Sequence, residues 1–200
     1  MEPSVKGSLL LNAAVAMRRH RDAGRVSEDE LAARLGPAAL ELLDQKIDVS
    51  RWYPIDGFCE MVNMDWEIAA GRDPDYARRM GQDSAARFFQ SGIYQQLDYA
   101  KRVARVESRS ALVRQSRLIT TVTNTLYSFI EIDVQVEGDN LVIFFGDAAA
   151  FSEALRYTTE GFMDEINRQQ GSARRWSSER IAPDRVRFEL NLPKRLHGGD

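Results

Sequence analysis

The chain contains one cysteine, Cys59, and a thiol can act as a nucleophile or accept an acyl group. Cys59 lies in a segment that Pro54 opens, on the face where apolar residues repeat at helical spacing. A reactive thiol needs a neighbouring cation or imidazole, and no lysine or histidine lies within two helical turns of Cys59. We therefore favour a buried, unreactive thiol. A reactive or acylated cysteine that faces a pocket is the alternative.

Acid–base catalysis has few candidate residues. The two histidines are His20, within a run of arginines, and His197, close to the end of the chain, and neither position suits a general base. The carboxylates of Glu60, Asp65 and Glu67 are spaced so that we expect them to face solvent on one helix. The sequence has no glycine-rich phosphate loop, no HExxH motif, no paired-cysteine motif and no GxSxG elbow. We predict that the protein is not an enzyme, with an unrecognised carboxylate site as a distant alternative.

Aromatic side chains are concentrated in the middle of the chain, at Trp52, Tyr53, Phe58, Trp66, Phe88, Phe89 and Tyr94. Packing between helices is the simplest explanation, because buried aromatics dominate core energetics. The alternative is the lining of a pocket for a small apolar ligand. The candidate ligand-binding residues are Phe58, Cys59, Trp66, Phe88 and Tyr94.

Basic side chains form a second cluster, at Lys101, Arg102, Arg105, Arg109, Arg114 and Arg117. We favour a solvated helix face. The alternative is a surface for an acidic protein partner, with Arg102, Arg105 and Arg109 as the candidate contacts. The whole chain carries a net charge of -3, which argues against binding to nucleic acid or to an anionic membrane.

Composition indicates one globular domain. A chain of 200 residues with 44% hydrophobic residues is long enough for one sizeable core. No run approaches the roughly eighteen apolar residues of a membrane-spanning helix, and the apolar start is followed at once by basic residues, unlike a cleaved signal peptide. A single cysteine excludes an internal disulfide. We expect a soluble, cytoplasmic protein.

The first part of the chain, residues 7–127, is predicted to be entirely helical. The Ser27 to Glu30 segment is a capping box, and Pro37 and Pro74 suit first helical turns. Small residues around Gly81 predict close packing of that helix against another one. Helices are expected over 7–23, 27–35, 37–45, 54–70, from 74 to beyond 88, and over 108–127.

Residues 128–193 change to strand patterning and predict a ββαββ part. Ile130 to Val136 alternates apolar and polar residues, and Leu141 to Phe145 is continuously apolar. A helix capped by Asp147 follows, and Val186 to Leu192 alternates again. The predicted fold class is α+β, a single domain over 1–200. In it a helical N-terminal layer packs with a small four-stranded antiparallel sheet of hairpin-helix-hairpin layout.

Three short segments carry a family resemblance: Lys6-Gly7-Ser8, Trp52-Tyr53-Pro54, and 81–94 with its Ala-Ala and Phe-Phe pairs. Together with the closing hairpin, they resemble an uncharacterised family that is expanded as paralogues in myxobacteria. The C-terminal half is also similar in layout to a superfamily of haem-nitric-oxide-binding domains, vinyl-reductase-type ligand-binding domains and the core subunits of the TRAPP tethering complex.

That resemblance implies a small or apolar ligand between sheet and helices, and dimerisation through the helices. The haem-binding branch needs a histidine on an inward helix face, which neither His20 nor His197 is expected to supply. Acylation, as in the TRAPP branch, would fall on Cys59. We hypothesise a non-catalytic, homodimeric regulatory sensor of a small apolar ligand, with no particular cofactor indicated. The alternative is a protein-protein interaction adaptor without a ligand.

Overall fold

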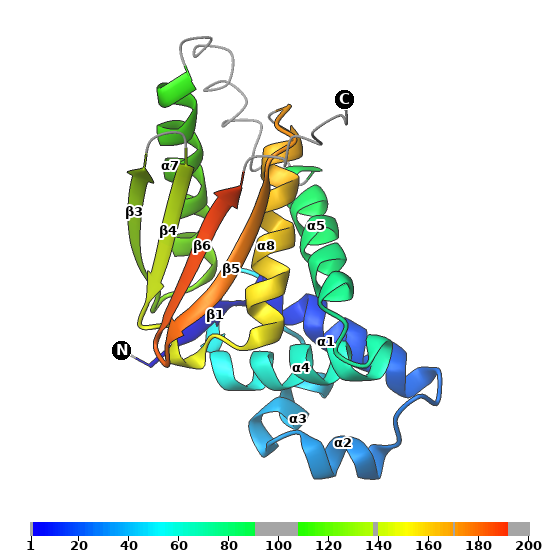
Figure 1. Cartoon of the computed structure of the whole chain (residues 1–200). Coiled ribbons are helices and arrows are strands. Elements are labelled where there is room, and N and C mark those ends of the chain that lie inside the picture. The colour runs from blue at the N-terminus through cyan, green and yellow to red at the C-terminus, as the bar shows by residue number, and fades with distance from the viewer. Residues whose placement is uncertain (1, 91–107, 138–139, 170, 192–200) are drawn as a thin grey trace, which may run out of the picture.

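The structure is a computed structural model of the chain, and it describes residues 2–90, 108–137, 140–169 and 171–191. The helices of the first part are α1 (Gly7–Asp22), α2 (Glu28–Arg34), α3 (Pro37–Asp44), α4 (Ile55–Ala70), α5 (Pro74–Gln90) and α7 (Ser108–Leu126) (Figure 1). The capping box is confirmed, because the Ser27 hydroxyl accepts the Glu30 N–H at 3.2 Å and the Glu30 carboxylate accepts the Ser27 N–H at 2.9 Å. No helix in these ranges has the length and apolar composition needed to cross a bilayer.

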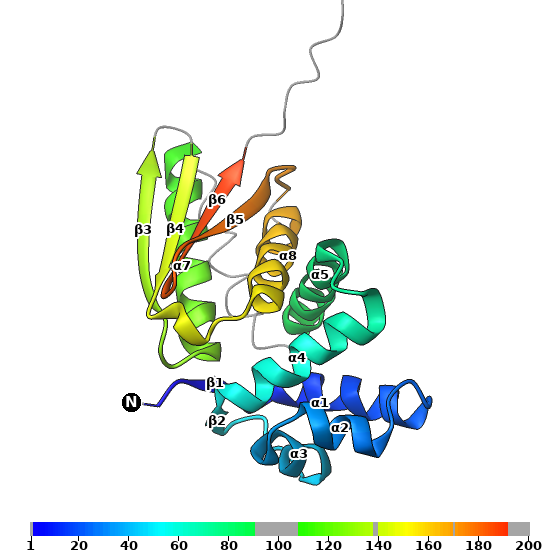
Figure 2. The same ribbon diagram turned by 60° about the horizontal axis from the view of Figure 1, so that its bottom comes forward.

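The expectation that residues 7–127 are entirely helical is wrong at Trp52–Pro54, which form a strand. Strands β1 (Ser4–Lys6) and β2 (Trp52–Pro54) form a two-stranded antiparallel sheet in which Val5 lies opposite Tyr53. Strand β2 ends where α4 begins, so Pro54 lies just outside that helix. The pair ties the start of α1 to the start of α4. These helices form, with α2 and α3, a layer at one end of the molecule (Figure 2).

The C-terminal part has the predicted hairpin-helix-hairpin layout. Its strands are β3 (Glu131–Glu137), β4 (Asn140–Gly146), β5 (Arg175–Ala182) and β6 (Arg185–Asn191), and its long helix is α8 (Glu153–Gln169). The sheet is antiparallel, in the order β3-β4-β6-β5. The α+β fold class is therefore confirmed.

The cap predicted for the long helix is wrong. Asp147 has a left-handed backbone with φ 54° and leads into a short 3-10 helix, η1 (Ala148–Ala150). Helix α8 begins only at Glu153, after Phe151 has entered the core. Ser152 takes the capping position, with its hydroxyl 3.4 Å from the Leu155 N–H.

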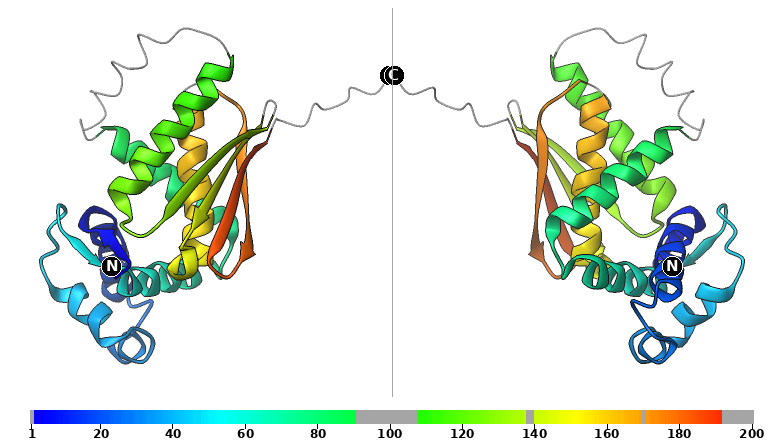
Figure 3. Two further views of the ribbon diagram at one scale, coloured as in Figure 1. Left: turned by 90° about the vertical axis from the view of Figure 1, so that its left-hand side faces the viewer. Right: turned by 90° about the vertical axis from the view of Figure 1, so that its right-hand side faces the viewer.

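Helices α7 and α8 cover one face of the four-stranded sheet, and no helix of the described residues covers the other face (Figure 3). Inward-facing Val186, Phe188 and Leu190 are buried, whereas Arg187 pairs on the outer face with Glu179 at 3.3 Å. This alternation is what a sheet covered on one side requires.

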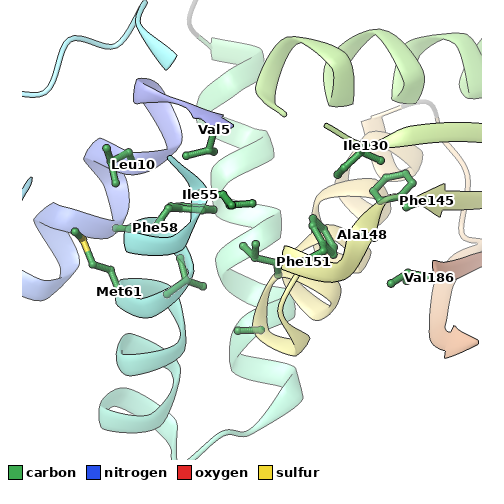
Figure 4. Packing of buried hydrophobic residues seen from close by; sticks show 14 of the residues in the cluster. Val5, Leu10, Ile55, Phe58, Met61, Ile130, Phe145, Ala148, Phe151 and Val186 are labelled. Carbon is green, nitrogen blue, oxygen red and sulfur yellow. The ribbon is translucent and has the colours of Figure 1, made fainter. Parts of the chain in front are cut away.

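One hydrophobic core joins the two parts of the chain. Figure 4 shows Val5, Leu10 and Phe58 from the helical layer in the same cluster as Phe145 and Phe151. The last two rings meet edge to face at 5.7 Å between centroids. The strands therefore shield apolar side chains that the helical layer supplies, as the sequence predicted.

The close packing predicted at Gly81 is confirmed. A Cβ at Gly81 would lie 1.9 Å from the Thr158 carbonyl oxygen of α8, and a Cβ at Gly161 would lie 1.9 Å from the Arg78 carbonyl oxygen of α5. Each helix thus presents a glycine to the backbone of the other. Beside this crossing, Arg78 pairs with the buried Glu160 at 2.6 Å. The crossing fixes α5 against α8, which are two walls of the cavity described next.

Candidate ligand cavity

A cavity of about 560 Å³ lies between α1, α4, α5, α7 and α8 and reaches the sheet at β4. Its lining is mainly apolar, as Ala16 of α1, Phe58 of α4, Val122 of α7 and Phe162 of α8 illustrate. Phe145 of β4 also contributes to the lining. This volume falls within the range of about 300–1,000 Å³ typical of small-molecule sites. The cavity therefore has the size and character of a site for a compact apolar ligand.

One end of the cavity is polar and buried. His20 of α1 and Asp65 of α4 both line it, with 5% and 2% of their surface exposed. The His20 Nε2 lies 2.7 Å from the Asp65 Oδ1, and the Tyr76 hydroxyl of α5 donates to the Asp65 Oδ2 at 3.3 Å. Three helices are joined at one carboxylate. The bonds fix the orientation of the imidazole beside the cavity.

The second nitrogen of this imidazole has a weaker contact. The Arg25 Nη1 lies 3.5 Å from the His20 Nδ1, at the outer limit of a hydrogen bond. A neutral imidazole fits both contacts, with Nε2–H donating to Asp65 and Nδ1 accepting from Arg25. In this tautomer His20 keeps an acceptor directed toward the arginine at the edge of the cavity.

Tyr76 stays a hydrogen-bond donor over the physiological range. Burial and the neighbouring Asp65 carboxylate raise the pKa of Tyr76 to about 12. Burial also raises the pKa of Tyr127, another residue of the lining. Neither phenol ionises near neutral pH, so neither adds negative charge to the cavity.

The positions predicted for His20 and Asp65 are wrong. His20 is buried although arginines surround it in the sequence, and Asp65 does not face solvent. The helical spacing of both residues from buried apolar residues was the sequence signal that could have predicted their burial. His20 follows the buried Met17 by three residues, and Asp65 follows the buried Val62 by three, so each lies on the inner face of its helix. Glu60 and Glu67 are only partly buried, and Glu67 pairs with Arg34 at 2.8 Å.

The structure distributes the five candidate ligand-binding residues over different environments. Phe58 lines the cavity. Trp66 packs against Tyr157 with tilted rings, 5.8 Å between centroids, and donates its indole N–H to the Asp73 carbonyl. Phe88 packs on Phe162, which itself lines the cavity, with 5.9 Å between ring centroids. Tyr94 lies outside the described residues.

Cys59 lies on α4 beside Phe58 but is absent from the lining of this cavity. Its Sγ donates to the Ala150 carbonyl of η1 at 3.2 Å.

The structure describes little of the segment that carries the candidate partner contacts. Arg102 and Arg105 lie outside the described residues, and for Arg109 only the backbone, in the first turn of α7, is described.

We expect Cys59 to react slowly with a maleimide in the folded protein. Burial raises the pKa of Cys59 from 9.0 to about 12, so at pH 8 the folded state holds about a thousandfold less thiolate than the unfolded state. The measurement is the rate of labelling at pH 8 in buffer and in urea. The site of labelling is unambiguous because the chain has one cysteine.

The same shift predicts the direction of a pH effect on stability. The folded-state pKa lies above the unfolded one, so the contribution of the neutral thiol is present below about pH 9 and is lost as the pH rises toward 12. Cys59→Ala should therefore flatten the alkaline loss of stability relative to the parent protein. Rapid, complete labelling of the native protein at pH 8 would contradict the burial of this thiol.

Among the described residues, the thiol of Cys59 is not placed to act as the nucleophile of a triad with His20 and Asp65. His20 and Asp65 form a base with its orienting carboxylate, but Cys59 bonds to the Ala150 carbonyl and its raised pKa makes it a poor nucleophile. Within the described residues, no group of three or more His, Cys, Asp or Glu side chains is placed to hold a metal ion. Binding, with a polar group at one end, is the chemistry that this geometry supports.

Comparisons with known proteins support the fold. No family model matches the chain, and no curated protein matches it by sequence. Solved structures do match. An Fe(II) unliganded H-NOX protein from K. algicida aligns with 13% identity and a TM-score of 0.57, over 96% of this chain and 98% of that one, and a single-residue variant of it reaches 0.61. An H-NOX protein from S. oneidensis in the Fe(II)NO state aligns with 14% identity and a TM-score of 0.50, over 94% of this chain and 99% of that one.

The chain therefore has a fold similar to that of H-NOX proteins over nearly its whole length. The predicted link to the haem-nitric-oxide-binding branch is confirmed at the level of fold. The vinyl-reductase and TRAPP links and the myxobacterial family stay predictions.

Proposed function

We propose that this chain is a non-catalytic sensor module that binds a small apolar ligand in the cavity between its helices and the sheet. The observation that carries the proposal is the cavity itself, with about 560 Å³ and a mainly apolar lining contributed by five helices. Such a ligand would contact elements from both halves of the chain. Binding would favour whichever arrangement of those elements the ligand contacts best, which is how a ligand acts on a sensor.

We propose a ligand other than haem, although the similar H-NOX structures are described with an Fe(II) centre. Haem iron needs an axial side chain with a free donor atom directed at the metal. The only imidazole in the described part of the chain is His20, whose Nε2 is held by Asp65 and whose Nδ1 faces the cationic Arg25. The Tyr76 hydroxyl is held by the same carboxylate. These two residues do not fit an axial ligand. Burial raises the pKa of Tyr127, so its phenol stays protonated, and the thioethers of Met80 and Met163 would need a histidine on the other side of the iron. We therefore propose an organic, metal-free ligand.

The absence of catalysis is part of the proposal. The buried His20–Asp65 pair is better explained as a positioning contact between α1 and α4. The one thiol of the chain has its pKa raised to about 12, so it is a poor nucleophile for this pair to activate.

We also propose that the protein acts as a homodimer, as the resemblance implied. The mass of the purified chain measured by light scattering tests this.

An adaptor without ligand is the alternative, and it needs an exposed docking face. The large apolar side chains exposed in the described part of the chain are Val49, Trp52 and Ile181, at 52%, 42% and 45%. Trp52 is already covered on one side by the Lys6 ammonium group, 4.3 Å from its ring. Single exposed apolar residues are normal on soluble proteins. The cavity is thus the stronger observation, and it favours the sensor.

Mass spectrometry of the purified, denatured protein separates the two functions. We expect one small apolar molecule per chain to be released. Ala16 lines the cavity, so Ala16→Trp places an indole in the space that the ligand needs and should abolish the release. Asp22→Trp is the matched control, because Asp22 is exposed at the end of the same helix, and it should retain the ligand. Repeated extraction without a stoichiometric compound would reject the sensor in favour of the adaptor.

A further inference from the structure

Three guanidinium groups border the cavity, and two of them, from Arg19 and Arg25, come from residues next to His20 and its Nδ1 contact at the polar end. Arg19, Arg25 and Arg87 belong to its lining, and their side chains reach solvent. None of them forms an ion pair with a residue that the structure describes. The Arg25 guanidinium group lies 3.5 Å from the His20 Nδ1, and the Arg87 Nη2 donates to the Ser84 hydroxyl at 3.3 Å. Other arginines are paired, such as Arg78 with Glu160 at 2.6 Å.

The carboxylates of the lining do not neutralise these arginines. Asp65 is engaged by the His20 imidazole and the Tyr76 hydroxyl. Asp83 is exposed, and it is the other acidic residue of the lining. At the His20 end, the lining has the guanidinium groups of Arg19 and Arg25 against the single Asp65 carboxylate, which leaves this end with an excess of positive charge. Arginine binds carboxylates in bidentate geometry, which makes an anionic group the best complement to this edge.

We propose that the ligand is a monoanionic amphiphile of the fatty-acid type, whose carboxylate lies at Arg19 and Arg25 and whose hydrocarbon tail fills the apolar cavity. This inference rests on the proposed function and deepens it by naming the class of ligand. The long contact between Arg25 and His20 is the one that a carboxylate would replace, because a charged acceptor takes a guanidinium N–H more strongly than a neutral imidazole does. Asp65 holds the imidazole in place while Arg25 turns to the ligand.

The tail accounts for the rest of the lining. It would lie against Val122 of α7, Phe162 of α8 and Phe145 of β4, which offer no charged group. Burying a methylene group strengthens binding about fourfold. Affinity should therefore rise with chain length until the tail fills the cavity. The proposed ligand therefore has two features that can be tested separately: an anionic head that binds arginine and a hydrocarbon tail that fills the cavity.

The test is calorimetry on the full chain after removal of bound lipid, with decanoate, decanol and hexanoate below their micelle concentrations. We expect decanoate to bind most tightly and hexanoate more than tenfold more weakly, because its tail is shorter. The double variant Arg19→Gln/Arg25→Gln should weaken decanoate by about tenfold or more and leave decanol unchanged. Arg79→Gln is the matched control, because Arg79 is an exposed arginine of α5 outside the lining, and it should change neither affinity.

The outcomes separate this inference from the proposed function. If decanol binds as tightly as decanoate, or if the double variant weakens both equally, the cavity binds apolar ligands without a carboxylate site and only this inference fails. If neither binds, the amphiphile class is rejected, and the extraction experiment decides the sensor by itself. Ala16→Trp should weaken both ligands, because it occupies the tail site.

Discussion

Gly81→Leu should lower the free energy of unfolding by at least about 3 kcal/mol, because its first side-chain atom already meets backbone. The built Cβ lies 1.9 Å from the Thr158 carbonyl oxygen and 2.8 Å from the Phe162 nitrogen. A rotamer change in a neighbouring side chain cannot relieve a clash with backbone, so α5 and α8 must move apart. For a chain of this size the loss corresponds to a melting temperature lower by about 6–12 °C.

The control for this prediction lies on the same helix. Arg79 is exposed, and its contact with Asp73 is long, at 3.9 Å. Arg79→Leu introduces the same side chain two residues away and should change stability by no more than about 0.5 kcal/mol. Thermal unfolding followed by circular dichroism compares the two variants with the parent. Equal melting temperatures for Gly81→Leu and the parent would show that the helices do not cross at this glycine.

The sequence predicted the elements whose patterns are long. Strand β3 alternates over seven residues and β4 carries a continuous apolar run, so both were expected where they are found. The β1–β2 pair was missed for a physical reason. Three residues contain too little alternation to indicate a strand, and the pairing of Val5 with Tyr53 joins segments far apart in the chain. Such pairing depends on the tertiary fold, which one sequence does not display.

The candidate site was predictable only in its apolar part. Phe58 was expected at the cavity because it lies on an apolar helical stripe, and it does line the cavity. His20 and Asp65 were assigned to the surface by residue type, although their spacing from Met17 and Val62 placed them on buried faces. For these two residues, helical spacing indicates burial correctly, whereas the polarity of the side chain does not. The hydrogen bond between them joins two helices, so no local sequence pattern predicts it.

Asp65→Ala should cost about 3 kcal/mol of stability. The change leaves the His20 Nε2–H and the Tyr76 hydroxyl without their acceptor at a buried position, and an unsatisfied buried polar group costs about 1–3 kcal/mol. Asn63→Ala is the matched control, because Asn63 is exposed on the same helix and should change stability by about 0.5 kcal/mol or less. Urea unfolding measures both variants. A cost for Asp65→Ala no greater than that of the control would contradict the buried bond.

A double-mutant cycle then isolates the bond itself. His20→Phe keeps a ring on the buried face of α1 but removes both nitrogens, so it should also destabilise the protein by leaving Asp65 with only the Tyr76 hydroxyl. Once either partner is gone, the other has less to lose, and the double variant should therefore cost less than the sum of the single variants. We expect a coupling energy of at least about 1 kcal/mol, the usual net value of a buried hydrogen bond. Strict additivity would mean that His20 and Asp65 are buried independently, and the polar end of the cavity would then lack the carboxylate that orients its imidazole.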